Sequence, residues 1–318
     1  MISVLVRNVV TEAQDVVRLV LGSADGSALP TFEAGAHIDV HLPSGLIRQY
    51  SLCRLQVDAQ YYEIAVLKDP QSRGGSAEIH QLKIGDAVSI SAPKNHFSLV
   101  DNKRKSLLVA GGIGVTPMLP MAQQLQKMGR PFEFHYCAKS PETAAFSSAL
   151  NDASFSTNMH FHYSQVPGSG RMDVVNVLSR HTFDSELYIC GPAAFIHDVL
   201  QQAKMLGWPE DRLHREFFSA PALDEAITEN SAFQVKVRSS GALYDVAADE
   251  SVFEVLDRNG VFVAVSCESG VCGTCQTGLI EGIPDHRDVF LTDKEKAQGK
   301  WFMPCCSRSK SPILELDL

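Results

Sequence analysis

The chain has 318 residues, of which 45% are hydrophobic and 20% are charged, and its formal net charge at pH 7 is −9. A chain of this length and composition is expected to form two or three globular domains, each with a core of its own. The acidic balance argues against nucleic acid as a partner, since such binding requires a basic patch.

The sequence also predicts where the protein works. No apolar run approaches the roughly 18–20 residues that a transmembrane helix needs. Residues Met1–Arg7 have the pattern of a strand rather than of a signal peptide. Eight cysteines in such a chain favour metal binding over disulfides. We therefore expect a cytoplasmic protein without membrane contact.

Residues 1–102 have the pattern of an antiparallel β-barrel, because many short strands alternate with Gly, Pro and Asp turns. A short helix, Ser76–Leu82, is expected to interrupt them. The predicted strands are Ile2–Val10, Asp15–Gly22, His37–Leu42, Arg48–Cys53, Tyr61–Lys68 and Ala87–Ala92.

Two segments of this barrel are candidates for ligand binding. The run Arg48-Gln49-Tyr50-Ser51 places a cation, an aromatic ring and a hydroxyl on one strand. The run Arg73-Gly74-Gly75-Ser76 combines a cation with glycines at a helix start, where exposed amides favour an anion. Either segment alone is also compatible with ordinary surface and packing roles. Together they predict a phosphate site beside a ring-stacking surface.

These segments resemble the flavin domain of the phthalate dioxygenase reductase family, and the resemblance extends over essentially the whole chain. Members of that family combine an FMN barrel, an NAD domain and a C-terminal plant-type ferredoxin, so the resemblance implies FMN in preference to FAD. The implied flavin contacts are Arg48, Gln49, Tyr50 and Ser51, with Ala65, Val66 and Lys68 along the ring edge and Gly74, Gly75 and Ser76 at the phosphate.

Residues 103–220 change to alternating apolar runs and helical segments, which predicts an α/β nucleotide-binding domain with a parallel sheet. Strand Ser106–Ala110 leads into a turn that contains Gly111, Gly112 and Gly114, followed by helix Met118–Met128. Such a turn lets backbone amides approach a pyrophosphate. Because Pro117 stands where a third motif glycine would be, a plain tight turn remains an alternative. Further strands are expected at Phe132–Cys137, Met159–Ser164 and Glu186–Cys190, and helices at Pro141–Leu150 and from Pro192 to about Leu206.

The order of these turns is similar to ferredoxin reductase-type nicotinamide domains. That resemblance implies that Thr116 lies near the nicotinamide, that Cys190, Gly191 and Pro192 shape its pocket, and that Phe218 covers a flavin face. For Phe217 and Phe218 an ordinary buried strand end is the alternative. The family prefers NADH, although Lys139, after the second strand, leaves NADPH open.

Residues 221–231 have the composition of a linker, and residues 232–318 are predicted to form an α+β ferredoxin domain of the β-grasp type. The expected elements are a hairpin, Phe233–Arg238 with Leu243–Ala247, a helix capped by Ser251, and a strand, Phe262–Val265, that leads into a cysteine-rich loop.

That loop carries the most specific motif in the chain. Cys267, Cys272 and Cys275 have the C-x4-C-x2-C spacing of a plant-type [2Fe–2S] ferredoxin, with a fourth cysteine far downstream. Gly270 and Gly273 are expected to let the loop bend around the cluster. Cys305 and Cys306 are adjacent and cannot easily both be ligands; the family pattern Cys-x-Ser-Arg selects Cys305.

Together these sites predict an NADH-dependent flavin and iron–sulfur oxidoreductase. A flavin is needed because nicotinamide gives up two electrons as a hydride, whereas the cluster accepts one at a time. The family resemblance implies that a separate Rieske-type terminal oxygenase receives the electrons. Two alternatives are a reductase for another acceptor, such as a ferredoxin, quinone or haem protein, and a redox-sensing binding protein.

Overall fold

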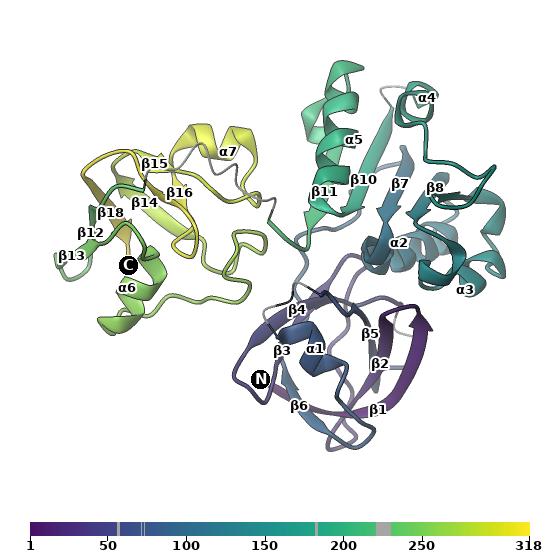
Figure 1. Cartoon of the computed structure of the whole chain (residues 1–318), viewed down its shortest axis with the longest axis horizontal. Helices are drawn as coiled ribbons and strands as arrows, with labels where there is room; N and C mark the ends of the chain where they lie inside the picture. The colour runs from purple at the N-terminus through teal and green to yellow at the C-terminus, as the bar shows by residue number, and fades with distance from the viewer. Residues whose placement is uncertain (56–57, 71, 73, 182–183, 221–229) are drawn as a thin grey trace. The chain divides into compact units, whose positions relative to one another are not determined.

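The computed structural model describes the whole chain except residues 56–57, 71, 73, 182–183 and 221–229. The chain divides into two compact units, Met1–Phe218 and Ser219–Leu318 (Figure 1). The predicted linker, 221–231, falls largely outside the described residues, as does Arg73 of the predicted anion site.

The first part of the first unit is the predicted antiparallel barrel. Its strands follow the order β4-β3-β6-β1-β2-β5. The two end strands meet through a bridge between Leu52 and Ile64, which closes the sheet. The short helix α1 lies against β5. The elements are β1 (Ile2–Ala13), β2 (Val16–Ser23), β3 (His37–His41), β4 (Ile47–Ser51), β5 (Tyr61–Leu67), α1 (Gly75–Ile79) and β6 (Ala87–Ile90).

The second part of this unit is a five-stranded parallel sheet in the order β11-β10-β7-β8-β9. From β7 the chain adds two strands on one side and then returns to add two on the other. The strands are β7 (Lys105–Gly111), β8 (Phe132–Ala138), β9 (Met159–Tyr163), β10 (Ser185–Gly191) and β11 (Leu213–Phe217). The main helices are α2 (Val115–Lys127), α3 (Ser147–Asn151), α4 (Val174–Ser179) and α5 (Ala193–Met205), and a 3-10 turn, η1 (Gly112–Gly114), precedes α2.

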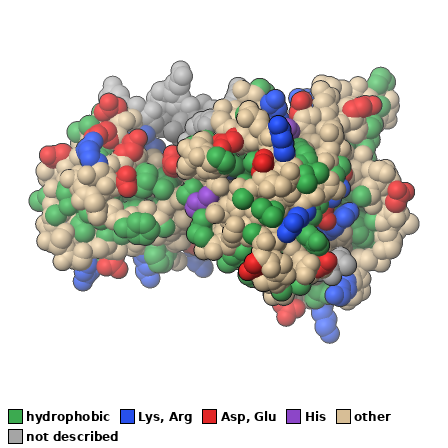
Figure 2. All heavy atoms as spheres, turned by 90° about the horizontal axis from the view of Figure 1, so that it is seen from below, with side chains coloured by type: hydrophobic (Ala, Val, Ile, Leu, Met, Phe, Trp, Pro, Cys, Tyr) green, Lys and Arg blue, Asp and Glu red, His purple; other side chains and the backbone are tan. Residues whose placement is uncertain are grey.

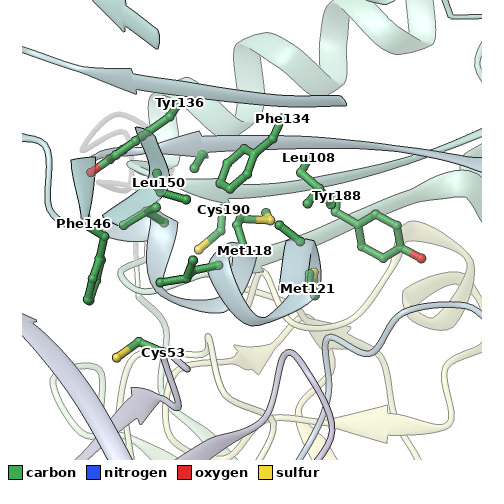
Figure 3. Close-up of a cluster of buried hydrophobic side chains, with 14 of the residues drawn as sticks. Cys53, Leu108, Met118, Met121, Phe134, Tyr136, Phe146, Leu150, Tyr188 and Cys190 are labelled. Carbon is green, nitrogen blue, oxygen red and sulfur yellow. The ribbon is translucent and has the colours of Figure 1, made fainter. Parts of the chain in front are cut away.

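One hydrophobic core joins the barrel to the parallel sheet. Cys53 and Ala65 from the barrel belong to the same buried cluster as Met118 of α2 and Cys190 of β10. Figure 3 shows this arrangement, with Cys53 below α2 and the sheet side chains above it. The barrel and the parallel sheet therefore pack as one unit.

The second unit is the predicted β-grasp domain. Its main sheet has the order β13-β12-β18-β14-β16, with β12 and β18 parallel. Helix α6 is capped by Ser251, whose hydroxyl accepts the Glu254 amide. The elements are β12 (Phe233–Val237), β13 (Leu243–Val246), α6 (Val252–Arg258), β14 (Thr277–Glu281), β15 (Pro284–Asp285), α7 (Asp293–Gln298), β16 (Trp301–Phe302), β17 (Arg308–Ser309) and β18 (Ile313–Asp317).

Three predicted elements were wrong in detail. The segment 262–265 is not a strand, although its side chains alternate between exposed Phe262 and buried Val263. The predicted helix Pro141–Leu150 is a 3-10 turn followed by the short helix α3. Helix α2 begins three residues earlier than predicted, at Val115, because Pro117 fits the first turn of a helix, where amides have no intrahelical acceptor.

Charged side chains are mixed over the surface. On the face drawn in Figure 2, acidic and basic groups alternate and hydrophobic side chains lie between them. Each helix among the described residues is too short or too polar to cross a lipid bilayer.

Candidate cofactor sites and cluster centre

The first group of predicted flavin contacts, Arg48 to Ser51, lies on β4. Gln49 donates to Asp39 at 2.9 Å, which holds its amide on β3. Tyr50 is partly buried, and this burial raises the pKa of its phenol. The hydroxyl of Ser51 is buried and has no hydrogen-bond partner among the described residues. Such an orphaned polar atom fits a bound polar ligand.

The predicted phosphate cradle is built by close packing between α1 and β4. Gly74, before the helix, has φ of 100°, which favours glycine. A Cβ on Gly75 would lie 2.6 Å from Cγ of Arg48, so only glycine leaves room for that side chain. Ser76 has a hydroxyl that accepts the Asp69 amide at 3.1 Å. The structure thus brings Arg48, from one predicted segment, against the glycine pair of the other.

The remaining predicted flavin contacts lie on β5 or just after it. Ala65 and Val66 are buried, and Lys68 is exposed in the loop that follows. Strand β5 contacts η1 of the parallel-sheet part. The barrel strand and the first glycine turn are therefore neighbours inside one unit.

The two glycine turns meet at the carboxyl ends of β7 and β10. These strands are paired, with Cys190 beside Ala110. They flank the point where the strand order reverses, which is where open α/β sheets bind ligands. A Cβ on Gly114 would lie 2.3 Å from the carbonyl oxygen of Cys190, and one on Gly191 would lie 3.0 Å from Cα of Gly111. The two turns are thus in backbone-to-backbone contact, which at Gly114 only glycine permits.

The three predicted catalytic residues have different environments. Thr116 is buried, and its hydroxyl donates to the Ile113 carbonyl at 2.9 Å. Cys190 is fully buried, and its side chain joins the core that faces α2 (Figure 3). Burial raises the pKa of its thiol, which argues against a reactive thiolate. Phe218 follows β11 and is 41% exposed, so the alternative of a buried strand end is wrong for this residue; it holds for Phe217.

Sequence reasoning missed Glu216 as a candidate. Its position on β11 pairs with Cys190 of β10. The carboxyl group is buried, and one of its oxygens has no hydrogen-bond partner among the described residues. Burial raises its pKa to about 8. A carboxyl group with a perturbed pKa beside a ligand crevice is a candidate for a functional role. The parallel register, rather than any local pattern, places it there.

The second unit brings the four predicted cluster cysteines together. The sulfurs of Cys275 and Cys305 are 3.3 Å apart, although thirty residues separate them in sequence. The thiol of Cys267 in turn interacts with the thiols of Cys272 and Cys305, so the four sulfurs form one connected group. This convergence of four sulfurs fits a [2Fe–2S] cluster, and we expect these cysteines to hold it.

The loop around these cysteines also has the required backbone. Gly270 and Gly273 both have positive φ angles, 72° and 73°. Each lies tightly packed, so a Cβ on Gly273 would lie 2.2 Å from the Phe290 ring. Backbone amides of Ser269 and Thr274 donate to the Cys267 and Cys272 sulfurs at 3.5 and 3.4 Å. Amides directed at the sulfurs are a means of tuning a cluster's potential.

Cys306 faces a different environment from Cys305. Its sulfur is 4.0 Å from the Met303 carbonyl oxygen and 3.9 Å from the Ser307 hydroxyl. A Cβ on Gly270 would lie 2.6 Å from this sulfur, so Cys306 packs against Gly270 of the loop. The imidazole of His286 has Nδ1 3.5 Å from a carboxylate oxygen of Asp288.

A closed flavin-type barrel, a switch-point crevice and a four-cysteine centre define a pyridine-nucleotide-dependent iron–sulfur oxidoreductase. Comparisons with known proteins agree. Residues 235–310 match the 2Fe-2S iron-sulfur cluster binding domain. The vanillate O-demethylase oxidoreductase of Pseudomonas sp. (strain HR199 / DSM 7063) is 47% identical over 100% of both chains.

Solved structures extend the likeness to the whole fold. One is the structure of phthalate dioxygenase reductase, described as a modular structure for electron transfer from pyridine nucleotides to [2Fe-2S]. It has a TM-score of 0.75 at 38% identity, and the match covers 99% of this chain and 97% of that one. An intact type IV self-sufficient cytochrome P450 monooxygenase has a TM-score of 0.88 at 34% identity; all of this chain matches 41% of that longer one. The chain therefore belongs to the phthalate dioxygenase reductase family.

Proposed function

We propose that this chain is the reductase component of an oxygenase system, which takes a hydride from NADH onto FMN and passes single electrons through its [2Fe–2S] cluster to a separate Rieske-type terminal oxygenase. The observation that carries the proposal is the contact between β5 and η1 within one compact unit. It sets the strand expected to line the flavin ring beside the turn expected to receive nicotinamide.

In this proposal the chain's own residues bind and orient the cofactors. Arg48, Gly74 and Gly75 at the start of α1 would hold the FMN phosphate, and Ser51 would supply a buried hydroxyl to the flavin. The turns at Gly114 and Gly191 hold the coenzyme by backbone contact. When bound, the flavin accepts a hydride and releases its electrons singly to the cluster, which is cofactor chemistry that the protein positions.

Anaerobic titration of the purified protein with NADH, followed by absorbance and EPR, tests the relay. We expect bleaching of a flavin band together with the EPR signal of a reduced [2Fe–2S] cluster. The flavin released on denaturation is expected to be FMN. Bleaching without cluster reduction would rule out internal transfer to the four cysteines, and failure of NADH to bleach the flavin would rule out the hydride step.

The identity of the electron acceptor is proposed mainly from the similar proteins. The relative at 47% identity is named for vanillate O-demethylation, which supports an oxygenase that acts on a related aromatic compound. The longer P450 chain favours a haem acceptor as the second candidate. Reconstitution with a Rieske-type demethylase oxygenase and with a P450 haem domain, each at equal concentration, separates the two. Faster substrate-coupled NADH consumption identifies the acceptor.

A cytoplasmic location is also part of the proposal. A centre held by cysteine thiolates is compatible with a reducing compartment. Cell fractionation with antibody detection tests it; recovery in the periplasmic fraction would contradict it.

A further inference from the structure

A cluster of histidines lies in the parallel-sheet part, away from the carboxyl-end crevice. Glu133 and His135 occupy the first half of β8, and His160 lies near the start of β9. His135 and His160 are register partners on adjacent parallel strands. Their side chains occupy the face of the sheet opposite Phe134 and Tyr136, which pack in the core against α2.

The candidate ligand atoms in this cluster lie close to one another. The nearest ligand atoms of Glu133, His135 and His160 all lie within 4.8 Å of one another. One oxygen of Glu133 is 2.8 Å from Nε2 of His135 and 3.6 Å from Nε2 of His160. Two ligands on one tetrahedral zinc ion lie about 3.4 Å apart. Small side-chain rotations are therefore enough to admit a metal ion.

A candidate fourth ligand, outside the group of three whose ligand atoms lie within 4.8 Å of one another, comes from the segment after α4. His181 is 7% exposed, and its Nε2 lies 3.3 Å from the second oxygen of Glu133. This nitrogen makes no hydrogen bond among the described residues. This nitrogen therefore stands at ion-pair distance from Glu133 but is not aligned for a hydrogen bond with it. A cation between the two groups would satisfy both.

We propose that Glu133, His135, His160 and His181 form a binding site for a divalent transition-metal ion of the zinc type, separate from the flavin, nicotinamide and [2Fe–2S] sites. The donor set of three imidazoles and one carboxylate is one that zinc accepts. The ion ties β8 to the neighbouring strand β9 and to the segment after α4.

The surroundings of His135 support this assignment. Its Nδ1 lies 2.9 Å from Nε2 of His162. A metal-bound imidazole donates its other N–H to an acceptor, and His162 occupies that position.

Two cations compete with the metal for the same carboxylate. Lys105 Nζ lies 3.0 Å from one oxygen of Glu133, and an Arg180 nitrogen lies 3.6 Å from the other. Both side chains are partly exposed, at 41% and 54%, and can turn to solvent when a metal enters. Their charge makes a specific prediction: removing Lys105 tightens metal binding, whereas removing a ligand weakens it.

The test uses the full-length protein with flavin and cluster bound. Equilibrium dialysis against zinc chloride, with zinc and iron measured by mass spectrometry, is expected to show one zinc per chain and unchanged iron. Because His160 lies on an edge strand with a side chain 44% exposed, His160→Gln preserves the fold. It is expected to weaken zinc binding by at least about tenfold. Lys105→Gln strengthens it severalfold, and His41→Gln, on β3, has no effect.

Thermal unfolding provides a second measurement. Zinc is expected to raise the Tm of the wild type and of the His41→Gln variant, and to leave that of His160→Gln unchanged. The proposal is overturned if the wild type binds no zinc, if His160→Gln binds it as the wild type does, or if zinc uptake displaces iron, which would place the metal at the cysteines.

Discussion

The contact between the two glycine turns yields the sharpest test of the nicotinamide crevice. In Gly114→Ala the new Cβ would lie 2.3 Å from the Cys190 carbonyl oxygen and 2.7 Å from the Gly191 nitrogen. Both are backbone atoms, so no side chain can rotate away. Restoring an ordinary separation of about 3.5 Å moves the start of α2 from the β10 turn by roughly 1 Å.

The expected consequences are kinetic as well as structural. Overpacking of this kind costs about 1–3 kcal/mol of stability. A displacement of about 1 Å between groups that position a reactant costs on the order of 100-fold in rate. We expect kcat/KM for flavin reduction by NADH, measured by anaerobic stopped flow, to fall by about that factor.

A matched control separates the crevice from general destabilisation. Gly129 follows α2 with φ of +63°, and a Cβ there would meet nothing within 4 Å. Gly129→Ala should lower stability by roughly 1–2 kcal/mol through backbone strain alone and leave flavin reduction unchanged. If Gly114→Ala folds and reduces its flavin at the wild-type rate, the turn-to-turn contact does not position the coenzyme.

Three further predictions concern single side chains. Cys305→Ser should lose the cluster, as judged by iron content and visible absorption, whereas Cys306→Ser should keep it; the reverse pattern would reassign the fourth ligand. Arg48→Gln should weaken FMN binding by roughly 10–100-fold, because a charge-assisted hydrogen bond is lost, and fluorescence of released flavin measures this; unchanged affinity would move the phosphate elsewhere. Since burial raises the folded-state pKa of Glu216 from 4.5 to about 8, stability should fall as pH rises between these values. Urea unfolding at about pH 6 and about pH 8 should show this loss in the wild type and not in Glu216→Gln, and equal losses would refute it.

The sequence predicted the site best where all the residues of a motif lie in one short segment. The spacing of Cys267, Cys272 and Cys275 predicts their convergence because the loop itself brings them together, and Gly270 and Gly273 have the positive φ angles that the loop requires. The family pattern selected Cys305, which the structure places 3.3 Å from Cys275 by sulfur distance.

The features that were missed depend on which strands pair. An alternating pattern over 262–265 predicts a strand, but a strand also needs a hydrogen-bonding partner, and the sheet order β13-β12-β18-β14-β16 does not include this segment. Glu216 becomes notable only because β11 pairs with β10. His135 and His160 are twenty-five positions apart, and only the β8–β9 register stacks their rings, with centroids 4.7 Å apart. The residue pattern within one strand does not show which residues of a neighbouring strand it pairs with.

The division of the chain into two units follows from what each step of the proposed relay requires. Hydride transfer needs flavin and nicotinamide in contact, and the two parts proposed to bind them share one core, which contains Ala65 of the barrel and Cys190 of the parallel sheet. A [2Fe–2S] cluster needs four thiolates and the amides around them, all of which lie between Cys267 and Cys305. Among the described residues, the core of the second unit is built from its own side chains alone. The cluster centre can therefore form independently of the flavin and nicotinamide sites, and loss of a cysteine ligand should leave flavin reduction by NADH intact.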